Sequence, residues 1–297
     1  MKKCLIVLIS LVFILTACGS VDLDAPAPVF ETGVDPESWA SIPAGEFLHG
    51  QFDEPAVLDY DYEMMVTNVT NAQYAAFLNA AIADGTASVV DHQVEGYYAG
   101  DKFNGGRHEV EIAAGDYIYV PLDDPALRLT YDNGTFAAKA EWANHPVTMV
   151  SWFGAKAYCE YYGWHLPSEL EWEKAARGTD NRPFPWGETI ARNNANYIAS
   201  RDPFEDMSTF GSRTTPVGFY NGNVYDGYQT LDSSSPYGLY DMAGNVWQWT
   251  NDVYEFQHYR YMRGGSSIVY ENQLRIWQRN NATPTFYSPA VGFRCAR

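Results

Sequence analysis

The residues best suited to chemistry in this sequence are four cysteines and six histidines, and they form no common catalytic pattern. The histidines are scattered at positions 49, 92, 108, 145, 165 and 258, without the spacing of a metal site. We predict that each is a polar residue at the surface or at the edge of the core. The sequence contains no His-Glu-x-x-His, Gly-x-Ser-x-Gly or Walker A motif and no dinucleotide-binding glycine pattern. None of these signatures therefore predicts an activity.

The N-terminal segment has the pattern of a secretory signal peptide. Lys2 and Lys3 supply a positive start, and residues 4–15 form an apolar run interrupted only by Ser10. This run is too short for a comfortable transmembrane helix and has the length of the apolar part of a signal peptide. We predict that residues 1–17 are removed on export; an uncleaved anchor helix is the alternative. Either way, the rest of the chain is expected outside the cytoplasm.

The last residues of this segment, Leu15-Thr16-Ala17-Cys18, resemble the lipobox of bacterial lipoproteins. The resemblance implies that Cys18 is lipidated and anchors the chain to a lipid bilayer of the bacterial cell envelope. Once Cys4 is removed and Cys18 is acylated, Cys159 and Cys295 remain. In an oxidising compartment we expect one disulfide between them, worth ~4–5 kcal/mol in the chain-entropy model. Two separate buried thiols are the alternative.

The composition is that of a folded, strongly acidic protein. Of 297 residues, 46% are hydrophobic and 15% aromatic, which excludes wholesale disorder. Acidic residues number 37 against 19 basic ones, for a formal charge of −18. This balance argues against nucleic-acid binding, because the phosphates would be repelled. It fits a well-solvated exported surface; a surface that gathers cations such as calcium is the alternative.

The chain is expected to form one domain behind a tether. Residues 18–38 show little apolar periodicity and are predicted to be a flexible tether that starts at the lipidated cysteine. Order is expected to begin at Trp39, and no repeat or second linker follows. The predicted domain therefore covers residues 39–297.

Capping residues and apolar spacing predict three helices in this domain. The first predicted helix begins at Thr70 or Asn71. The second begins at Ser151 and ends at Tyr162, before Gly163. The third begins at Ser168, whose capping-box partner is Glu171, and ends before Gly178. The turn Asp132-Asn133-Gly134 predicts a hairpin over residues 129–137. Short strands and turns fill the rest, so an irregular α+β domain is expected.

A series of sequence blocks resembles the formylglycine-generating enzyme (sulfatase-modifying factor) family. In order, the blocks are Ile42–Phe47, Val69–Tyr74, Pro146–Trp152, Ala155–Cys159, Leu166–Glu169, Glu171–Glu173, Ala175–Gly178, Pro185–Gly187, Thr215–Gly218, Tyr237–Trp247, Arg263–Ser266 and Gly292–Arg294. They stand in the family's order from residue 42 to the C-terminal end. Residues 84–141 match more weakly and are expected to form an insertion between the first two helices.

The resemblance implies a compact, loop-rich α+β fold akin to the C-type lectin fold. Members of the family bond a cysteine in the helix that matches Cys159 to one directly after the closing Gly-Phe-Arg, here Cys295. The resemblance therefore supports the disulfide independently.

The match breaks at the residues that carry the family's activity. Its oxidases bind copper(I) through two cysteines, because this soft ion favours sulfur. The matching positions here hold Val269 and Leu274, which cannot ligate copper or form a mixed disulfide. Ser266 and Trp247 match residues that line the family's active-site pocket, and a purely structural role is the alternative for both. No catalytic residue is assigned, and copper is not expected.

Calcium is the cofactor that the resemblance implies. Asp241, Gly244, Val246 and Gln248 match a family calcium site of side-chain and backbone oxygens, with Gln248 in place of the usual glutamate. A second site is implied more weakly, with the ligands Asn196, Asp206 and Phe210. The alternative for both is a loop rich in Asn and Asp that holds no metal.

Three functions are compatible with these observations: a formylglycine-generating oxidase, another metal-dependent oxidase, and a calcium-stabilised ligand-binding module. We favour the third, because both thiols are missing and the iron ligands of the family's ergothioneine-synthesis relatives lie in a domain that this chain lacks. Its ligand would be a glycan or a surface protein, contacted by side chains that suit such surfaces. These are Tyr270, Asn272, Trp277, Asn280, Asn281, Phe286 and Tyr287. The alternative is that these aromatic residues belong to the core.

Overall fold

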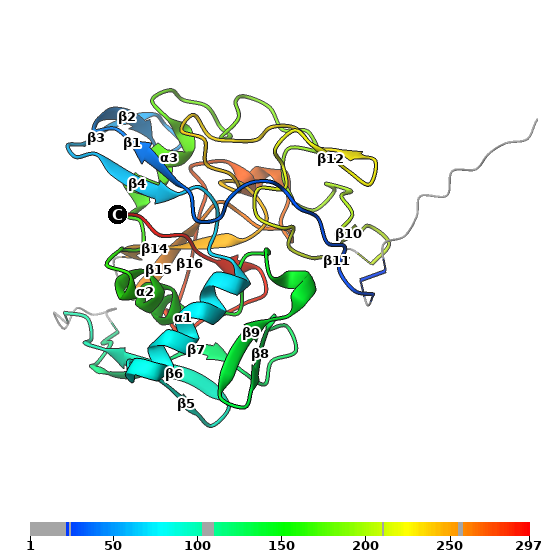
Figure 1. The fold of residues 1–297 in the computed structure, drawn as a ribbon. Coiled ribbons are helices and arrows are strands. Elements are labelled where there is room, and N and C mark those ends of the chain that lie inside the picture. The colour runs from blue at the N-terminus through cyan, green and yellow to red at the C-terminus, as the bar shows by residue number, and fades with distance from the viewer. Residues whose placement is uncertain (1–21, 24, 103–109, 210, 255–257) are drawn as a thin grey trace, which may run out of the picture.

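A computed structural model describes residues 22–297 except 24, 103–109, 210 and 255–257. Over this part of the chain, three α-helices and many short strands are joined by long loops (Figure 1). The predicted loop-rich α+β class is therefore confirmed. The predicted signal peptide, the lipidated Cys18 and the weaker calcium ligand Phe210 lie outside the described residues.

Helix α1 (Asn71–Asp84) begins and ends where its capping residues require. Thr70 is the N-cap, and its side chain accepts from the backbone N–H of Gln73 while the Gln73 side chain accepts from the N–H of Thr70. This reciprocal pair satisfies donors that the first turn leaves free. Gly85 ends the helix at φ 79°, a left-handed conformation that glycine adopts without steric cost. The predicted start is confirmed.

Helices α2 (Trp152–Tyr161) and α3 (Glu169–Arg177) also begin at the predicted caps. The Ser151 side chain accepts from the N–H of Gly154 in α2. In α3, Ser168 and Glu171 form the predicted capping box. Short-range capping chemistry thus fixes the start of all three helices.

The strands are arranged in small antiparallel sheets and one mixed four-stranded sheet. The two-stranded sheets are β1 (Trp39–Ile42) with β4 (Tyr62–Met65), β2 (Gly45–His49) with β3 (Glu54–Leu58), β8 (Leu129–Asp132) with β9 (Thr135–Ala138), β10 (Glu205–Asp206) with β11 (Gly211–Ser212), and β12 (Val224–Tyr225) with β13 (Tyr228–Gln229). The three-stranded sheet joins β5 (Ala87–Val90), β6 (Gln93–Tyr98) and β7 (Gly115–Pro121). The four-stranded sheet has the order β16 (Arg279–Ala282), β15 (Tyr259–Arg263), β14 (Trp247–Tyr254), β17 (Val291–Gly292), with β17 parallel to β14.

The four-stranded sheet lies between two groups of elements (Figure 1). The larger apolar cluster joins α1 and α2 to β14, β15 and β17 and to the β5–β9 region. A second cluster packs strands β1–β4 against α3, whose Trp172 is fully buried. Short elements are therefore held mainly by packing from distant parts of the sequence.

The region of residues 84–141, expected to be an insertion, supplies β5–β9 and a short 3₁₀-helix (Ala140–Trp142). The predicted hairpin is confirmed, since β8 pairs with β9 and the turn residues Asn133 and Gly134 have φ 49° and 80°. Positive φ at both central residues is typical of a tight hairpin turn.

The predicted boundary at residue 39 is too late. Ala27 is buried in an aromatic cluster, and the ring of Phe30 lies 5.3 Å from that of Tyr225. The Thr32 hydroxyl donates to the carbonyl oxygen of Val217. In the predicted tether (residues 18–38), the part from Ala27 onward therefore packs on the domain. The prediction was wrong because it relied on the local polarity of this segment. The few apolar side chains of the segment pack against residues about two hundred positions away.

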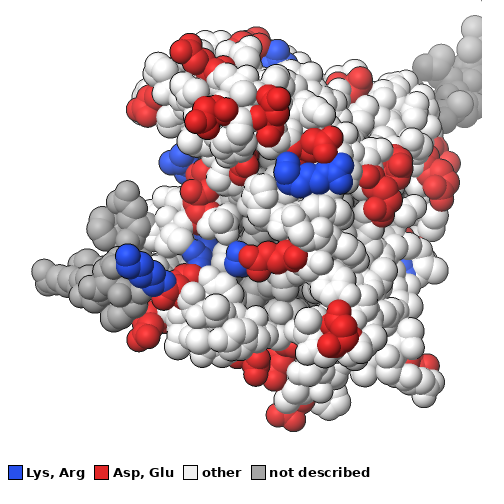
Figure 2. Space-filling view, turned by 60° about the vertical axis from the view of Figure 1, so that its left-hand side comes forward, with Lys and Arg blue, Asp and Glu red and all other residues white. Residues whose placement is uncertain are grey.

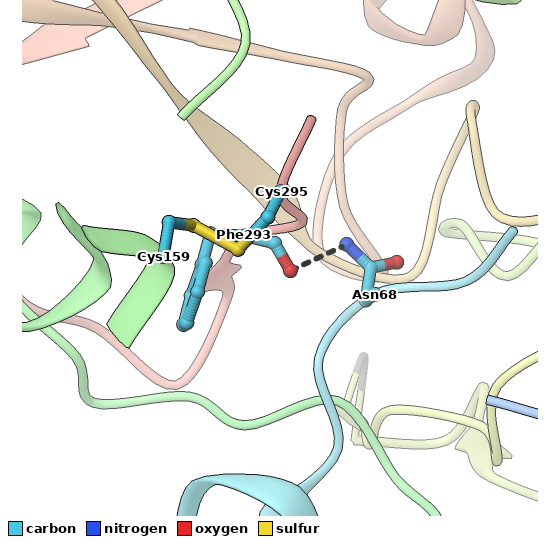
Figure 3. Close-up of a disulfide and its surroundings, with 4 residues drawn as sticks. All are labelled: Asn68, Cys159, Phe293 and Cys295. Atoms are coloured by element: carbon cyan, nitrogen blue, oxygen red, sulfur yellow. Dashed lines mark hydrogen bonds between the residues drawn. A yellow bond between two sulfur atoms is a disulfide. The ribbon is translucent and has the colours of Figure 1, made fainter. Parts of the chain in front are cut away.

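The predicted disulfide is confirmed. Cys159, in α2, and Cys295, near the C-terminus, are joined at an S–S distance of 2.01 Å, and both are fully buried (Figure 3). Asn68 lies beside the bond, and its side-chain amide donates to the carbonyl oxygen of Phe293 at 3.5 Å. The cross-link therefore ties α2 to the C-terminal segment where that segment meets the strand-to-helix connection before α1.

The surface reflects the acidic composition. On the face drawn in Figure 2, Asp and Glu side chains are scattered over the surface, and the few Lys and Arg side chains form no continuous stripe. No helix among the described residues is long and apolar enough to cross a membrane.

Candidate functional site

The two positions that match the family's copper-binding thiols are occupied by apolar packing residues. Leu274 is fully buried in a small cluster with Phe184, and Val269 is half-buried against the same cluster. Leu274 lies directly under the Gly-Gly turn, since a Cβ added to Gly265 would be 3.0 Å from its Cδ1. The only described cysteines are those of the disulfide. The described part of the chain thus offers no thiolate for copper.

Ser266 and Trp247, the pocket candidates, are both buried. The Ser266 hydroxyl has no hydrogen-bond partner within the described part of the chain. The backbone N–H of Trp247 donates to the carbonyl oxygen of Ala290, and the backbone N–H of Ser267 donates to the carbonyl oxygen of Asn245. Ala290 and Ser267, which take part in these bonds, line one small pocket, whereas neither Ser266 nor Trp247 is part of its wall.

This pocket, which we call the arginine pocket, has a volume of about 90 Å³. Its polar lining consists mainly of two arginines, an indole and hydroxyl groups: Arg128, Trp142, Thr148, Arg213, Thr214 and Ser267. Arg128 precedes β8, and Arg213 follows β11, so the insertion and a distant hairpin contribute one cation each. The guanidinium carbons of Arg128 and Arg213 lie 4.1 and 6.0 Å from the centre of the Trp142 ring.

His145 lies beneath this pocket and corrects one prediction. It is 1% exposed rather than at the surface or the core edge, and its ring lies 4.7 Å from that of Trp142. Its Nδ1 is 3.0 Å from the Thr214 hydroxyl, while its buried Nε2 has no partner among the described residues. Burial, aided by the charges of Arg128 and Arg213, lowers the pKa of His145 to about 3. The ring is therefore neutral at physiological pH.

Sequence reasoning missed the arginine pocket. Arg128 lies in the weakly matching insertion, and Arg213 lies between two family blocks, so neither motif search nor resemblance pointed to them. Basic residues are scarce in this chain, at 19 of 297, and their scarcity was the only available signal. Only the fold brings these two arginines together.

At the expected calcium site, the Gln248 side chain is fully buried and engaged at both ends. Its Oε1 accepts from the Trp172 indole N–H at 2.9 Å and from Arg294 Nε at 2.8 Å. Its Nε2 donates to the carbonyl oxygen of Asp241 at 2.7 Å. Two donors on one side and an acceptor on the other fix the amide orientation. Gln248 therefore presents an N–H group, not an oxygen, towards Asp241.

A protein cation already lies at this position. Arg294 is fully buried and donates to the carbonyl oxygens of Tyr240, Met65 and Val66 as well as to Gln248. Asp241 accepts from the N–H of Gly218 at 2.7 Å, and burial raises the pKa of its carboxyl group while the Arg294 charge lowers it. Gly244 and Val246 follow in the same buried loop. With the Gln248 amide N–H turned towards the Asp241 carbonyl oxygen, the Gln248 side chain in this arrangement offers no oxygen to a calcium ion.

The weaker second site is also engaged internally. The Asn196 amide donates to the carbonyl oxygen of Arg213 at 2.7 Å, and its oxygen accepts from the Ser212 hydroxyl. The Asp206 carboxylate accepts from the Ser208 and Thr209 hydroxyls instead. The two expected ligands thus bond to different partners. Over the residues that the structure describes, no group of three or more His, Cys, Asp or Glu side chains is arranged to hold a metal.

This geometry predicts that calcium binding depends on residue 248. In Gln248→Glu, an oxygen would replace the N–H that faces the Asp241 carbonyl, and a cation would relieve their repulsion. We expect millimolar calcium, relative to a chelator, to raise the thermal midpoint of this variant by roughly 2–4 °C, the shift for about 1 kcal/mol in a domain of this size. The wild type should not respond. Differential scanning calorimetry measures both.

A matched control is Gln51→Glu, which adds the same charge at an exposed glutamine. It should behave as the wild type does. Stabilisation of the wild type by calcium would contradict our interpretation of the Gln248 side chain.

Most of the predicted contact residues between Ser267 and Ala290 are at the surface. Tyr270 and Phe286 are exposed, Trp277 and Tyr287 are half-buried, and the three asparagines, Asn272, Asn280 and Asn281, are exposed. Two of the four aromatic residues, Tyr270 and Phe286, are thus at the surface, whereas Trp277 and Tyr287 are partly covered and Tyr287 packs against the main apolar cluster. They leave a polar and aromatic surface on the segment that follows the Gly-Gly turn.

Several known proteins are similar in sequence to this chain, and the share of each protein that is matched differs. The serine/threonine-protein kinase pkn1 of Chlamydia caviae is 33% identical over 57% of this chain, but the match spans only about a quarter (27%) of the kinase. The formylglycine-generating enzyme of Streptomyces coelicolor is 30% identical over 86% of this chain and 87% of the enzyme. The inactive Cα-formylglycine-generating enzyme 2 of Bos taurus is 36% identical over 51% of this chain and 50% of its own length.

A solved structure shares the fold. The structure of PvdO from Pseudomonas aeruginosa matches with a TM-score of 0.54 at 20% identity, covering 92% of this chain and 98% of PvdO. The sequence pattern described as "Sulfatase-modifying factor enzyme 1-like domain" matches residues 27–297. This range also agrees with the packing of Ala27 and Phe30 on the domain. The chain therefore belongs to the sulfatase-modifying factor family.

Proposed function

We propose that this chain is a ligand-binding member of its family and not a formylglycine-generating oxidase. The observation that carries this proposal is the replacement of both thiols by Val269 and Leu274, with Leu274 fully buried in an apolar cluster. Copper(I) prefers soft sulfur ligands, and function follows the residues of the site more closely than the fold. A calcium ion between Asp241 and Gln248 is not part of the proposal, because the Gln248 amide takes that place.

The relatives support this proposal, because the family contains both active oxidases and members without that activity. They include formylglycine-generating enzymes and an inactive counterpart. The near-full-length match to the Streptomyces enzyme favours the alternative, an oxidase that acts on exported proteins. The missing thiols weigh more heavily, since no other described cysteine is free to replace them.

The proposal includes display outside the cytoplasm. Lys2, Lys3 and the apolar run after them support export, and Cys18 supports a lipid anchor in a bacterial envelope. A lipid-anchored domain would present the exposed segment around Tyr270 and Phe286 to a glycan or a surface protein. Aromatic and amide side chains suit such contacts because they combine flat apolar area with adaptable hydrogen bonds.

An oxygen-consumption assay tests the proposal. The purified full-length chain, loaded with copper(I), is incubated with a Cys-x-Pro-x-Arg peptide, and oxygen uptake and peptide aldehyde are followed. We expect neither, whereas the Streptomyces enzyme treated in parallel should show both. Alkylation under native conditions followed by mass spectrometry should modify neither Cys159 nor Cys295. Turnover of the peptide, or a reactive thiol in the folded domain, would refute the binding role.

A further inference from the structure

We infer that a surface groove beside the β12–β13 hairpin binds an acidic sugar, one that carries a carboxylate or a sulfate group in addition to its hydroxyl groups. The groove, which we call the Tyr228 groove, has a volume of about 540 Å³. Its lining residues are Ala191, Arg192, Asn193, Arg201, Gly227, Tyr228 and Gln229. The inference rests on the proposed function, because it names the class of ligand that a binding module of this kind would recognise.

One phenol group holds together the two loops that carry the arginines of this groove. The Tyr228 hydroxyl, from β13, lies 3.1 Å from the carbonyl oxygen of Arg192 and 2.9 Å from that of Ser200, the residue before the second arginine. A further contact comes from Asn193, whose side-chain amide donates to the carbonyl oxygen of Gln229 at 2.9 Å. The loops around the groove are thus positioned before any ligand arrives, which lowers the entropic cost of binding.

Two cations and no carboxylate line the Tyr228 groove. Arg192 and Arg201 are both exposed, and in the described part of the chain neither guanidinium lies within ion-pair distance of a carboxylate. Only 19 of the 297 residues are basic, so two arginines in one groove are unusual for a chain with a formal charge of −18. The planar guanidinium group matches the paired oxygens of a carboxylate or a sulfate. The groove therefore favours an anionic group.

Two buried acidic residues lie close to the groove and are engaged in their own hydrogen bonds. The Asp202 carboxylate accepts from the Tyr220 hydroxyl. The Glu205 carboxylate accepts from the backbone N–H groups of Ala199 and Arg201. Their charges reduce the positive potential of the groove, but their oxygens point to these donors rather than to the two guanidinium groups.

Two exposed acidic residues border the groove without lining it. Asp226 directly precedes Gly227, and Glu271 lies near Tyr197. Burial and the charge of Glu271 raise the pKa of Tyr197, whereas the charge of Arg192 lowers it, so both charged groups act on this one ring. Carboxylates at the border repel a ligand with many negative charges. They favour a ligand with one anionic group, such as an acidic sugar, over an acidic peptide.

The groove also offers hydrogen-bond acceptors, which suit the hydroxyl groups of a sugar. The side-chain amide nitrogens of Asn193 and Gln229 donate to backbone carbonyl oxygens. These bonds fix the orientation of both amides and leave their side-chain oxygens without a partner among the described residues. Arginines that donate to an anion and amide oxygens that accept from hydroxyl groups together match a uronate or a sulfated sugar. The volume lies within the range of roughly 300–1,000 Å³ that is typical of small-ligand sites.

Isothermal titration calorimetry of the purified full-length chain tests the inference. The probes are digalacturonate for the carboxylate, 6-sulfated N-acetyllactosamine for the sulfate, cellobiose as an uncharged disaccharide and tetraaspartate as an acidic peptide. We expect one saturable site for at least one of the two acidic sugars, with an affinity at least about tenfold higher than for cellobiose or tetraaspartate. Arg192→Gln should weaken this binding by about five- to tenfold, because a charge-assisted hydrogen bond is lost.

Three further variants separate the charge of the groove from effects on folding. Arg275→Gln removes an exposed arginine outside the groove and should bind as the wild type does. Ala191 is an exposed lining residue, so Ala191→Glu and Ala191→Gln should both fold. The glutamate variant should bind the acidic sugar several-fold more weakly than the glutamine variant, because only the charge differs. Raising the salt concentration should weaken binding by the wild type more than binding by Arg192→Gln.

The outcomes distinguish failure of the inference from failure of the proposed function. No saturable binding of either acidic sugar, or equal binding by the wild type and Arg192→Gln, would overturn the inference. Saturable binding of tetraaspartate alone would assign the groove to an acidic peptide and would also overturn it. Loss of sugar binding in Tyr270→Ala but not in Arg192→Gln would overturn the inference and support the proposed function. Oxidase turnover by the same wild-type preparation would instead refute the proposed function.

Discussion

Replacing Arg263 by methionine is expected to lower the free energy of unfolding by about 3–5 kcal/mol. Arg263 is fully buried in β15 and contacts two carboxylates of α3, with Glu173 at hydrogen-bond distance and Glu169 2.9 Å from its Nε. Although burial opposes its charge, these carboxylates raise the pKa of Arg263 above its ordinary value. The substitution leaves each buried acid with only one arginine, Arg177 at 3.0 Å for Glu173 and the half-exposed Arg279 at 2.5 Å for Glu169. Urea denaturation followed by circular dichroism measures the loss.

Arg279→Met is the matched control for this prediction. Arg279 Nε lies 2.5 Å from the same Glu169, but its side chain is 44% exposed. An exposed ion pair contributes about 0–1 kcal/mol, so this variant should lose little stability. A similar small loss for Arg263→Met would show that water or rearrangement compensates the two acids, and that the contact between α3 and the four-stranded sheet does not depend on this ion pair.

The helix starts and the β8–β9 hairpin could be predicted because their causes are local. A Ser168–Glu171 capping box or an Asn133-Gly134 turn is decided by residues a few positions apart, and the structure places each where expected. The disulfide could be predicted for a different reason. Once the two N-terminal cysteines are set aside, only one pairing is left.

The arginine pocket and the contacts of the N-terminal segment could not be predicted in this way. Arg128 and Arg213 meet only because the insertion folds against the loop after β11, and Phe30 is half-buried only because Phe219 and Tyr225 lie beneath it. Such contacts join residues far apart in the sequence, which local patterns do not encode. The resemblance implied that Gln248 is a calcium ligand. In the structure, however, its side-chain oxygen accepts hydrogen bonds from Trp172 and Arg294.

Removing the disulfide is expected to lower the free energy of unfolding by about 5 kcal/mol in the double variant Cys159→Ala with Cys295→Ala. The bond closes a loop with a sequence separation of 136, so it restricts the unfolded chain strongly. It also ties α2 to the C-terminal segment, where the N–H of Met65 donates to the Cys295 carbonyl oxygen and the Arg294 side chain is buried. Urea denaturation of the oxidised wild type and of the double variant measures the difference.

Part of that loss comes from the small cavities left by two buried sulfur atoms, so the reduced wild type is the necessary comparison. It retains both sulfur atoms but lacks the cross-link, and it should lose most of the same free energy, whereas the double variant should be insensitive to reductant. Equal stability of the oxidised and reduced wild type would mean that packing of α1, α2 and the four-stranded sheet holds the C-terminal segment without the bond. In that case the bond would add no stability. It would still keep both sulfur atoms from acting as free thiols, so they could not serve as copper ligands.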